Sequence, residues 1–175
     1  GNWAIANGYF EQAVAQPNGA TNPEAQLWLG EGLLRLSEYA RAAAAYQTAL
    51  ELRENYPEAV FGLAQVRLAQ GDRPGALEYV DQALALRTNF AEAHLFRGKL
   101  LQETGRYPEA LAAYDASIKA NANLAESRYW RGVLHIRNDN FDGAISDLRR
   151  AVDIQPFFPE AHYWLGRAYF AQGRA

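Results

Sequence analysis

The stretch Ala91–Leu124, AEAHLFRGKLLQETGRYPEALAAYDASIKANANL, is the clearest copy of a pattern that recurs along the whole chain. Each half has the apolar spacing of an amphipathic helix, and the Gly105–Pro108 segment between the halves has the composition of a turn. Equivalent stretches begin 34 residues apart, at Pro23, Pro57, Ala91, Ala125 and Pro159. A constant period of this length predicts a solenoid of stacked two-helix units.

The composition limits the classes to which the protein can belong. Of the 175 residues 49% are hydrophobic, which is enough for a continuous core, and the net charge of −3 is too small to suggest nucleic acid as a partner. The absence of cysteine excludes disulfides, thiolate catalysis and cysteine-ligated zinc. No apolar run approaches the roughly 20 residues of a membrane span, so we expect no membrane insertion in this segment. The compartment stays open.

The chain also lacks methionine, even at its first position. We therefore interpret it as a piece of a longer protein, with Gly1 as a plausible cloning remnant. Along the chain we expect a half-unit at 1–22, four whole units at 23–56, 57–90, 91–124 and 125–158, and a second half-unit at 159–175. The first half-unit would hold only a second helix and the last only a first helix, which gives ten helices.

Small residues recur at fixed places in these units. The eighth position of each unit holds a small residue, in order Gly30, Ala64, Gly98, Gly132 and Gly166. Glycine inside a helix costs roughly 0.5–1 kcal/mol relative to alanine, so its recurrence at one place indicates close approach of two backbones. Large residues hold the matching place in the second helices, namely Tyr46, Val80, Tyr114 and Leu148. We expect large and small residues to interlock within each helical hairpin.

The pattern resembles the tetratricopeptide repeat family, with its motif W-x2-L-G-x2-Y, then A-x3-F, then P. The resemblance rests on Leu29-Gly30, Ala42 with Tyr46, Ala110 with Tyr114, and Leu165-Gly166 with Tyr169. It implies an all-α fold, a right-handed α-α superhelical solenoid, whose first helices line a concave groove. The sequence departs from the motif at its tryptophan position, which holds Gln26, Val60, His94, Arg128 and His162, and Arg97 and Arg131 replace the leucine before glycine.

No motif for catalysis, a metal or a cofactor stands out, and we expect this fragment not to be an enzyme. The histidines His94, His135 and His162 share no metal-ligand spacing. The 138–143 segment imitates the opening of a calcium-binding loop, but Arg149 stands where the required glutamate belongs. We interpret Asp142 as a helix cap. The arginines of the fourth whole unit, namely Arg128, Arg131, Arg137, Arg149 and Arg150, are balanced by carboxylates, which predicts a solvated, salt-bridged surface and no nucleic-acid site.

One side of the first helices points away from their hairpin partners, and the resemblance implies that this side lines the groove. Aromatic residues and arginines, which dominate binding hot spots, recur there. The candidate groove residues are Leu27, Trp28, Arg35, Phe61, Leu95, Phe96, Lys99, Tyr129, Trp130, Val133, Arg137, Tyr163, Trp164, Arg167 and Phe170. The alternative for the tryptophans is that they only seal neighbouring repeats.

These features favour a scaffold that binds another polypeptide, as a peptide or a helix, in its groove. A second possibility is head-to-tail self-association, in which the lone helix at 159–172 of one molecule pairs with the lone helix at 2–16 of the next. A third is that the array is a regulatory or substrate-docking arm of a catalytic domain outside this chain.

Overall fold

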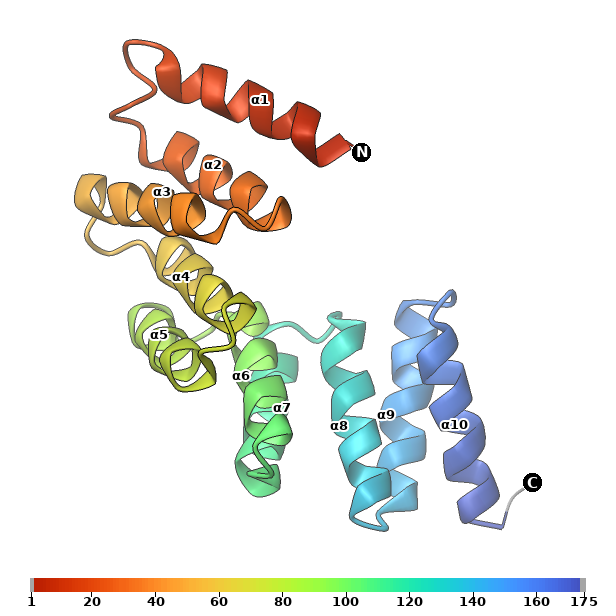
Figure 1. Cartoon of the computed structure of the whole chain (residues 1–175). Helices are drawn as coiled ribbons and strands as arrows, with labels where there is room; N and C mark the ends of the chain where they lie inside the picture. The colour runs from red at the N-terminus through yellow and green to blue at the C-terminus, as the bar shows by residue number, and fades with distance from the viewer. Residues whose placement is uncertain (1, 174–175) are drawn as a thin grey trace. The chain divides into compact units, whose positions relative to one another are not determined.

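The computed structural model describes residues 2–173, which form ten α-helices and no strand (Figure 1). In chain order the helices are α1 (Asn2–Ala15), α2 (Pro23–Arg35), α3 (Tyr39–Leu52), α4 (Pro57–Ala69), α5 (Arg73–Leu86), α6 (Ala91–Glu103), α7 (Tyr107–Ala120), α8 (Ala125–Arg137), α9 (Phe141–Ile154) and α10 (Pro159–Ala171). The all-α class and the helical-repeat fold expected from the sequence are confirmed.

The starts of the helices follow the sequence period. The five first helices begin at the five residues that open the expected units. Three of these residues are prolines, which suit the first helical position because no hydrogen bond is lost there. The second helices of the four whole units begin at Tyr39, Arg73, Tyr107 and Phe141. The cap before α9 is also different, since the Asn140 side chain, not Asp142, accepts the hydrogen bond from the Gly143 N–H at 3.1 Å. The interpretation of Asp142 as the cap was therefore wrong.

The first helices end in a backbone conformation that recurs with the same period. Gly71, Gly105 and Gly173 have φ of 83°, 77° and 76°, in the left-handed region that ends helices. Ser37 and Asp139 occupy the equivalent places with φ of 62° and 55°. The turn inside each hairpin is therefore the same in every repeat, whichever residue forms it.

The recurring glycines are the points of closest helix contact. A Cβ added to Gly30 would lie 2.7 Å from the Tyr46 ring, and one added to Gly62 would lie 2.4 Å from the same ring. Gly98 meets Tyr114 at 2.4 Å and Gly132 meets Leu148 at 2.8 Å in the same way. The expected interlocking of large and small residues is confirmed. In addition, Tyr46 inserts between two successive first helices.

The chain divides into two compact units, Gly1–Thr88 and Asn89–Ala175. In the first unit, α2 packs against α1, α3 and α4, and α4 also packs against α3 and α5. In the second, consecutive helices from α6 to α10 pack in order, and α8 also packs against α6 and α10. Each unit has its own apolar core, around Leu33 and Tyr46 in the first and around Ile145 and Leu148 in the second. None of the helices described has the length and apolar character needed to cross a membrane.

Candidate functional site

In the first unit, the candidate groove residues lie on α2 and α4. Trp28 is 50% exposed, whereas Leu27 is half-buried and packs against the core of the unit. The Arg35 guanidinium lies 5.3 Å from the centre of the Trp3 ring of α1. Phe61 on α4 is half-buried. Of these four candidates, only Trp28 and Arg35 are exposed.

In the second unit, four of the candidates come together in one pocket of about 390 Å³. Val133 and Arg137 come from α8, and Trp164 and Arg167 come from α10. The remaining wall consists of Gln102, Glu103, Tyr107, Leu134 and Ile136. We call this the arginine-lined pocket.

Both arginines of this pocket are stacked on aromatic rings. The Arg167 guanidinium carbon lies 4.7 Å from the centre of the Trp164 ring, and that of Arg137 lies 4.3 Å from the centre of the Tyr107 ring. Stacking holds a guanidinium in place while its N–H groups remain directed outward, where they can bind carboxylates in bidentate fashion. The pocket therefore combines an apolar surface with two oriented cations.

A second pocket of about 370 Å³ lies between the first turns of α8 and α10. It is lined by three aromatic residues, two carboxylates and one amide, namely Tyr129, Trp130, Phe158, Glu126, Glu160 and Gln155. We call this the aromatic-acidic pocket.

Contacts within this pocket fix its aromatic walls. Tyr129 packs against Trp130 and Phe158, with ring centres 5.0 and 4.9 Å apart. The Trp130 Nε1–H donates to Glu126 Oε1 at 3.3 Å. Burial raises the pKa of the Tyr129 hydroxyl and the side-chain hydrogen bond with Trp164 lowers it, while the charges of Glu160 and Glu126 raise it further.

Lys99 of α6 already contacts two residues of the aromatic-acidic pocket. The Lys99 ammonium pairs with Glu126 and lies 5.4 Å from the centre of the Trp130 ring. The charge of Glu126 is therefore neutralised by Lys99, which belongs to the same compact unit, Asn89–Ala175. Among residues 2–173, no ion pair to Glu160 is formed.

The other candidates are divided between the interior and the surface. Leu95 and Tyr129 are only 6% and 8% exposed, so both act mainly in packing. Phe96 is half-buried on α6. Tyr163 and Phe170, by contrast, are among the most exposed large residues of the described chain. Helix periodicity predicts a side of each helix for the groove but does not predict how deeply each residue is buried.

Comparison with known proteins identifies the family. The tetratricopeptide repeat model matches the chain in five overlapping segments, at residues 1–60, 29–91, 61–125, 95–157 and 129–175. The chain belongs to the tetratricopeptide repeat family. No curated protein matches its sequence.

Solved tetratricopeptide structures share the fold. The protein TTC0263 of Thermus thermophilus is 20% identical with a TM-score of 0.78, and the match covers 96% of this chain and 91% of that one. MamA is 24% identical with a TM-score of 0.73, covering 89% and 85%. YrrB, described as a tetratricopeptide protein with an unusual peptide-binding site, is 23% identical with a TM-score of 0.65, covering 93% and 82%. At these identities the likeness establishes the fold alone.

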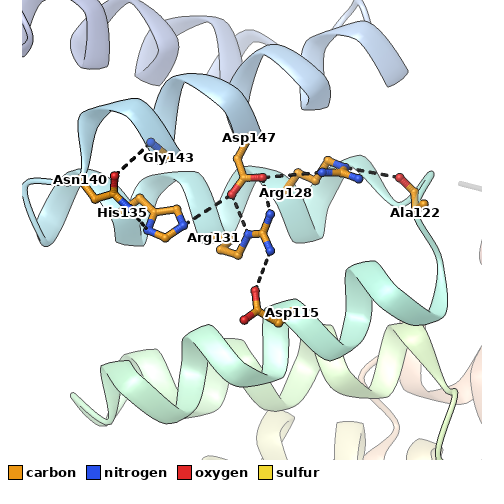
Figure 2. A network of polar contacts seen from close by, with 8 residues as sticks. All are labelled: Asp115, Ala122, Arg128, Arg131, His135, Asn140, Gly143 and Asp147. Atoms are coloured by element: carbon orange, nitrogen blue, oxygen red, sulfur yellow. Dashed lines mark hydrogen bonds and ion pairs between the residues drawn. The ribbon is translucent and has the colours of Figure 1, made fainter.

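An ionic network occupies the place of the leucine in the tetratricopeptide motif (Figure 2). Arg131 binds Asp147 through two hydrogen bonds of 2.7 and 2.6 Å and binds Asp115 at 2.6 Å. Arg128 and His135 approach the same Asp147 carboxylate at 3.7 and 3.8 Å. The hydrogen bond to Asp147 is the main reason why the pKa of Arg131 is raised. Because Asp115, Arg131 and Asp147 belong to α7, α8 and α9, this network links three helices.

This network corrects the expectation for the basic group of the fourth repeat. Asp147 is only 3% exposed, so its pairing with Arg131 is an interior feature and not part of a solvated surface. Arg149 and Arg150 are exposed, as predicted. Arg137 is also exposed but belongs to the arginine-lined pocket.

Several lining residues were missed by the sequence analysis. Tyr107 belongs to a second helix, whereas the predicted groove is lined by first helices. Gln155, Phe158 and Glu160 lie around the loop between α9 and α10. A comparison of loop positions at the 34-residue period would have found Gln155, because arginine stands at the equivalent Arg53 and Arg87. Among the residues described, no group of three or more potential metal ligands is present.

Proposed function

We propose that this chain is a scaffold that binds a segment of another polypeptide along its first helices, with the arginine-lined pocket as the main contact. Tetratricopeptide proteins are generally non-catalytic scaffolds for protein–protein interaction. We propose no catalytic role for this chain.

The observation that carries the proposal is the convergence of apolar and stacked cationic groups in one pocket. Val133 and Ile136 offer apolar surface, and Arg137 and Arg167 lie beside it on aromatic supports. An amphipathic segment could bury its apolar side chains here and place a carboxylate against either guanidinium. Because stacking already orders the two arginines, little side-chain freedom remains to be lost on binding.

The test is a peptide-display selection against the 175-residue chain, followed by affinity measurements with the enriched peptides. We expect these peptides to combine apolar and acidic residues. Trp164→Ala should weaken their binding about thirtyfold, the effect of losing a hot spot worth about 2 kcal/mol. Arg167→Ala should weaken the binding of acidic peptides more than the binding of the same peptides with glutamine in place of the acidic residues.

Phe157→Ala is the matched control, because Phe157 is an exposed aromatic in the loop before α10 and lines neither pocket. The Phe157→Ala variant should bind the selected peptides with the same affinity as the unmodified chain. Equal binding by Trp164→Ala would exclude the arginine-lined pocket as the main contact. Tyr129→Ala is unsuitable as a test. Tyr129 is only 8% exposed, so its replacement by alanine would leave a cavity in the core and destabilise the fold.

A second candidate function, head-to-tail self-association, is favoured by one observation at each end of the array. Nothing among the described residues lies within 4 Å of a Cβ added to Gly166, although Gly98 and Gly132 at the same position each receive a large side chain. Beside Gly166, Phe170 is 76% exposed. On α1, the apolar side chains of Trp3, Ile5 and Tyr9 are exposed as well. A second copy could bring its α1 against α10.

Light scattering over a wide range of protein concentration tests this candidate. We expect the average mass to rise with concentration, and we expect Phe170→Asp to abolish the rise because it places a charge in the contact. Phe157→Asp adds the same charge outside α10 and should leave the rise intact. A constant monomeric mass at the highest concentration would rule the candidate out.

A further inference from the structure

The first two repeats share an ionic contact that closes each hairpin. In the first repeat, the Arg53 side chain, just after α3, pairs with Glu24 in the first turn of α2. Its guanidinium carbon lies 4.4 Å from the centre of the Tyr56 ring. The hydrogen bond with Glu24 is the largest cause that raises the pKa of Arg53, and the charge of Glu58 adds to it. Arg53 is thus surrounded by two carboxylates and an aromatic ring.

The second repeat uses the same pair. Arg87 Nη1 lies 2.6 Å from Glu58 Oε1, and these residues follow Arg53 and Glu24 by one 34-residue period. An arginine at this position therefore recurs as the partner of the glutamate that opens the first helix.

The fourth repeat retains the surroundings of this arginine but not the arginine itself. Glu126, Phe158 and Glu160 are the period equivalents of Glu24, Tyr56 and Glu58, and all three line the aromatic-acidic pocket. The residue equivalent to Arg53 is Gln155, which carries no charge. Tyr129 and Trp130 add two further aromatic walls.

One carboxylate of the pocket is open to a cation. Lys99 pairs with Glu126, the equivalent of Glu24, whereas no ion pair to Glu160 is formed within residues 2–173. A guanidinium is planar, is weakly hydrated and stacks on aromatic faces, and it therefore suits a site with three aromatic walls better than an ammonium group does.

We propose that the aromatic-acidic pocket binds an arginine side chain of the partner polypeptide. The guanidinium lies against Phe158 and Trp130, as that of Arg53 lies against Tyr56. It pairs with Glu160, because Lys99 already holds Glu126, the equivalent of Glu24. This inference deepens the proposed scaffold function, because it adds a basic residue to a partner segment that is otherwise apolar and acidic.

The experiment is a titration of the 175-residue chain with the blocked tripeptide acetyl-Gly-Arg-Gly-amide, followed by nuclear magnetic resonance. The chain has only four tryptophans, so the indole N–H signal of Trp130 can be assigned with a Trp130→Phe variant. We expect a saturable shift of that signal. The same peptide with citrulline, which has the shape of arginine without its charge, should bind at least about tenfold more weakly.

Three variants make the test specific. Gln155→Arg supplies the chain's own arginine and should abolish the shift by filling the pocket. Asn121→Arg places the same new residue at the equivalent position of the third repeat, where Leu124 replaces the aromatic, and should leave binding intact. Glu160→Gln should weaken binding of the arginine peptide without filling the pocket.

Equal binding of the arginine and citrulline peptides, a shift that never saturates, or full binding by Gln155→Arg would each overturn the proposal. Failure of the scaffold function can be recognised separately. If the selected peptides bind Trp164→Ala as tightly as the unmodified chain, the arginine-lined pocket is not their binding site. The tripeptide titration tests the aromatic-acidic pocket alone.

Discussion

At the scale of single residues, the turn after each first helix depends on one left-handed residue. Glycine has this conformation at Gly71, Gly105 and Gly173, where the absence of a Cβ removes the steric cost. Ser37 and Asp139 adopt it with a side chain present. The repeat therefore imposes the conformation, and these two residues bear local strain that glycine would relieve.

We expect Ser37→Gly to raise the free energy of unfolding by about 0.5–1 kcal/mol, because relief of left-handed strain outweighs the added freedom of the unfolded chain. Urea denaturation measures the change. The control is Ser146→Gly at an exposed position inside α9, where the same replacement should lower the free energy of unfolding by roughly 0.5–1 kcal/mol. A decrease for both variants would show that Ser37 is not strained.

Residue spacing predicted which places are small and which are large, but not every contact that they make. The period aligned Gly30 with Tyr46, and this contact is present in the structure. That Tyr46 also fills the space at Gly62 depends on how successive hairpins stack, which spacing within one hairpin does not determine. The cap of α9 likewise depends on loop geometry, because Asn140 and Asp142 carry equally suitable oxygen atoms.

At the scale of helices, the sequence determined the order and boundaries of the elements more fully than the roles of their polar residues. The carboxylates and arginines of the fourth repeat balance in number, and this balance suggested a solvated surface. Arg131 instead spans from α8 to Asp115 on α7 and to Asp147 on α9 (Figure 2). Only packing decides whether such a pair is buried, since the pairing depends on the distance between neighbouring helices.

For the candidate site too, the sequence predicts which residues share a helix face but not how deeply they are buried. The periodicity of α8 and α10 predicts that Val133, Arg137, Trp164 and Arg167 lie on the groove side. In the structure these four residues line one pocket. The depth of Tyr129, in contrast, follows from its contact with Phe158. Phe158 precedes the next helix in the chain, so a helix considered alone gives no sign of this contact.

At the scale of the whole chain, helices pack mainly against their neighbours in sequence, and the contacts fall into two units. In such arrays the stability is close to a sum of repeat terms and terms between adjacent repeats. A local defect should therefore lower the stability of its own unit and leave the other nearly unchanged.

Two tyrosines at equivalent positions make this independence measurable. Tyr46→Ala removes a ring that packs against Gly30 and Gly62, and it should cost its unit roughly 3–5 kcal/mol because a cavity remains. Hydrogen exchange should then accelerate at least about a hundredfold in α2, α3 and α4, with little change in α8 and α9. Tyr114→Ala, which removes the ring against Gly98 in the second unit, should give the opposite pattern. If either variant lowers protection equally in both units, the chain unfolds as one cooperative body and the repeats are coupled across the Thr88–Asn89 boundary.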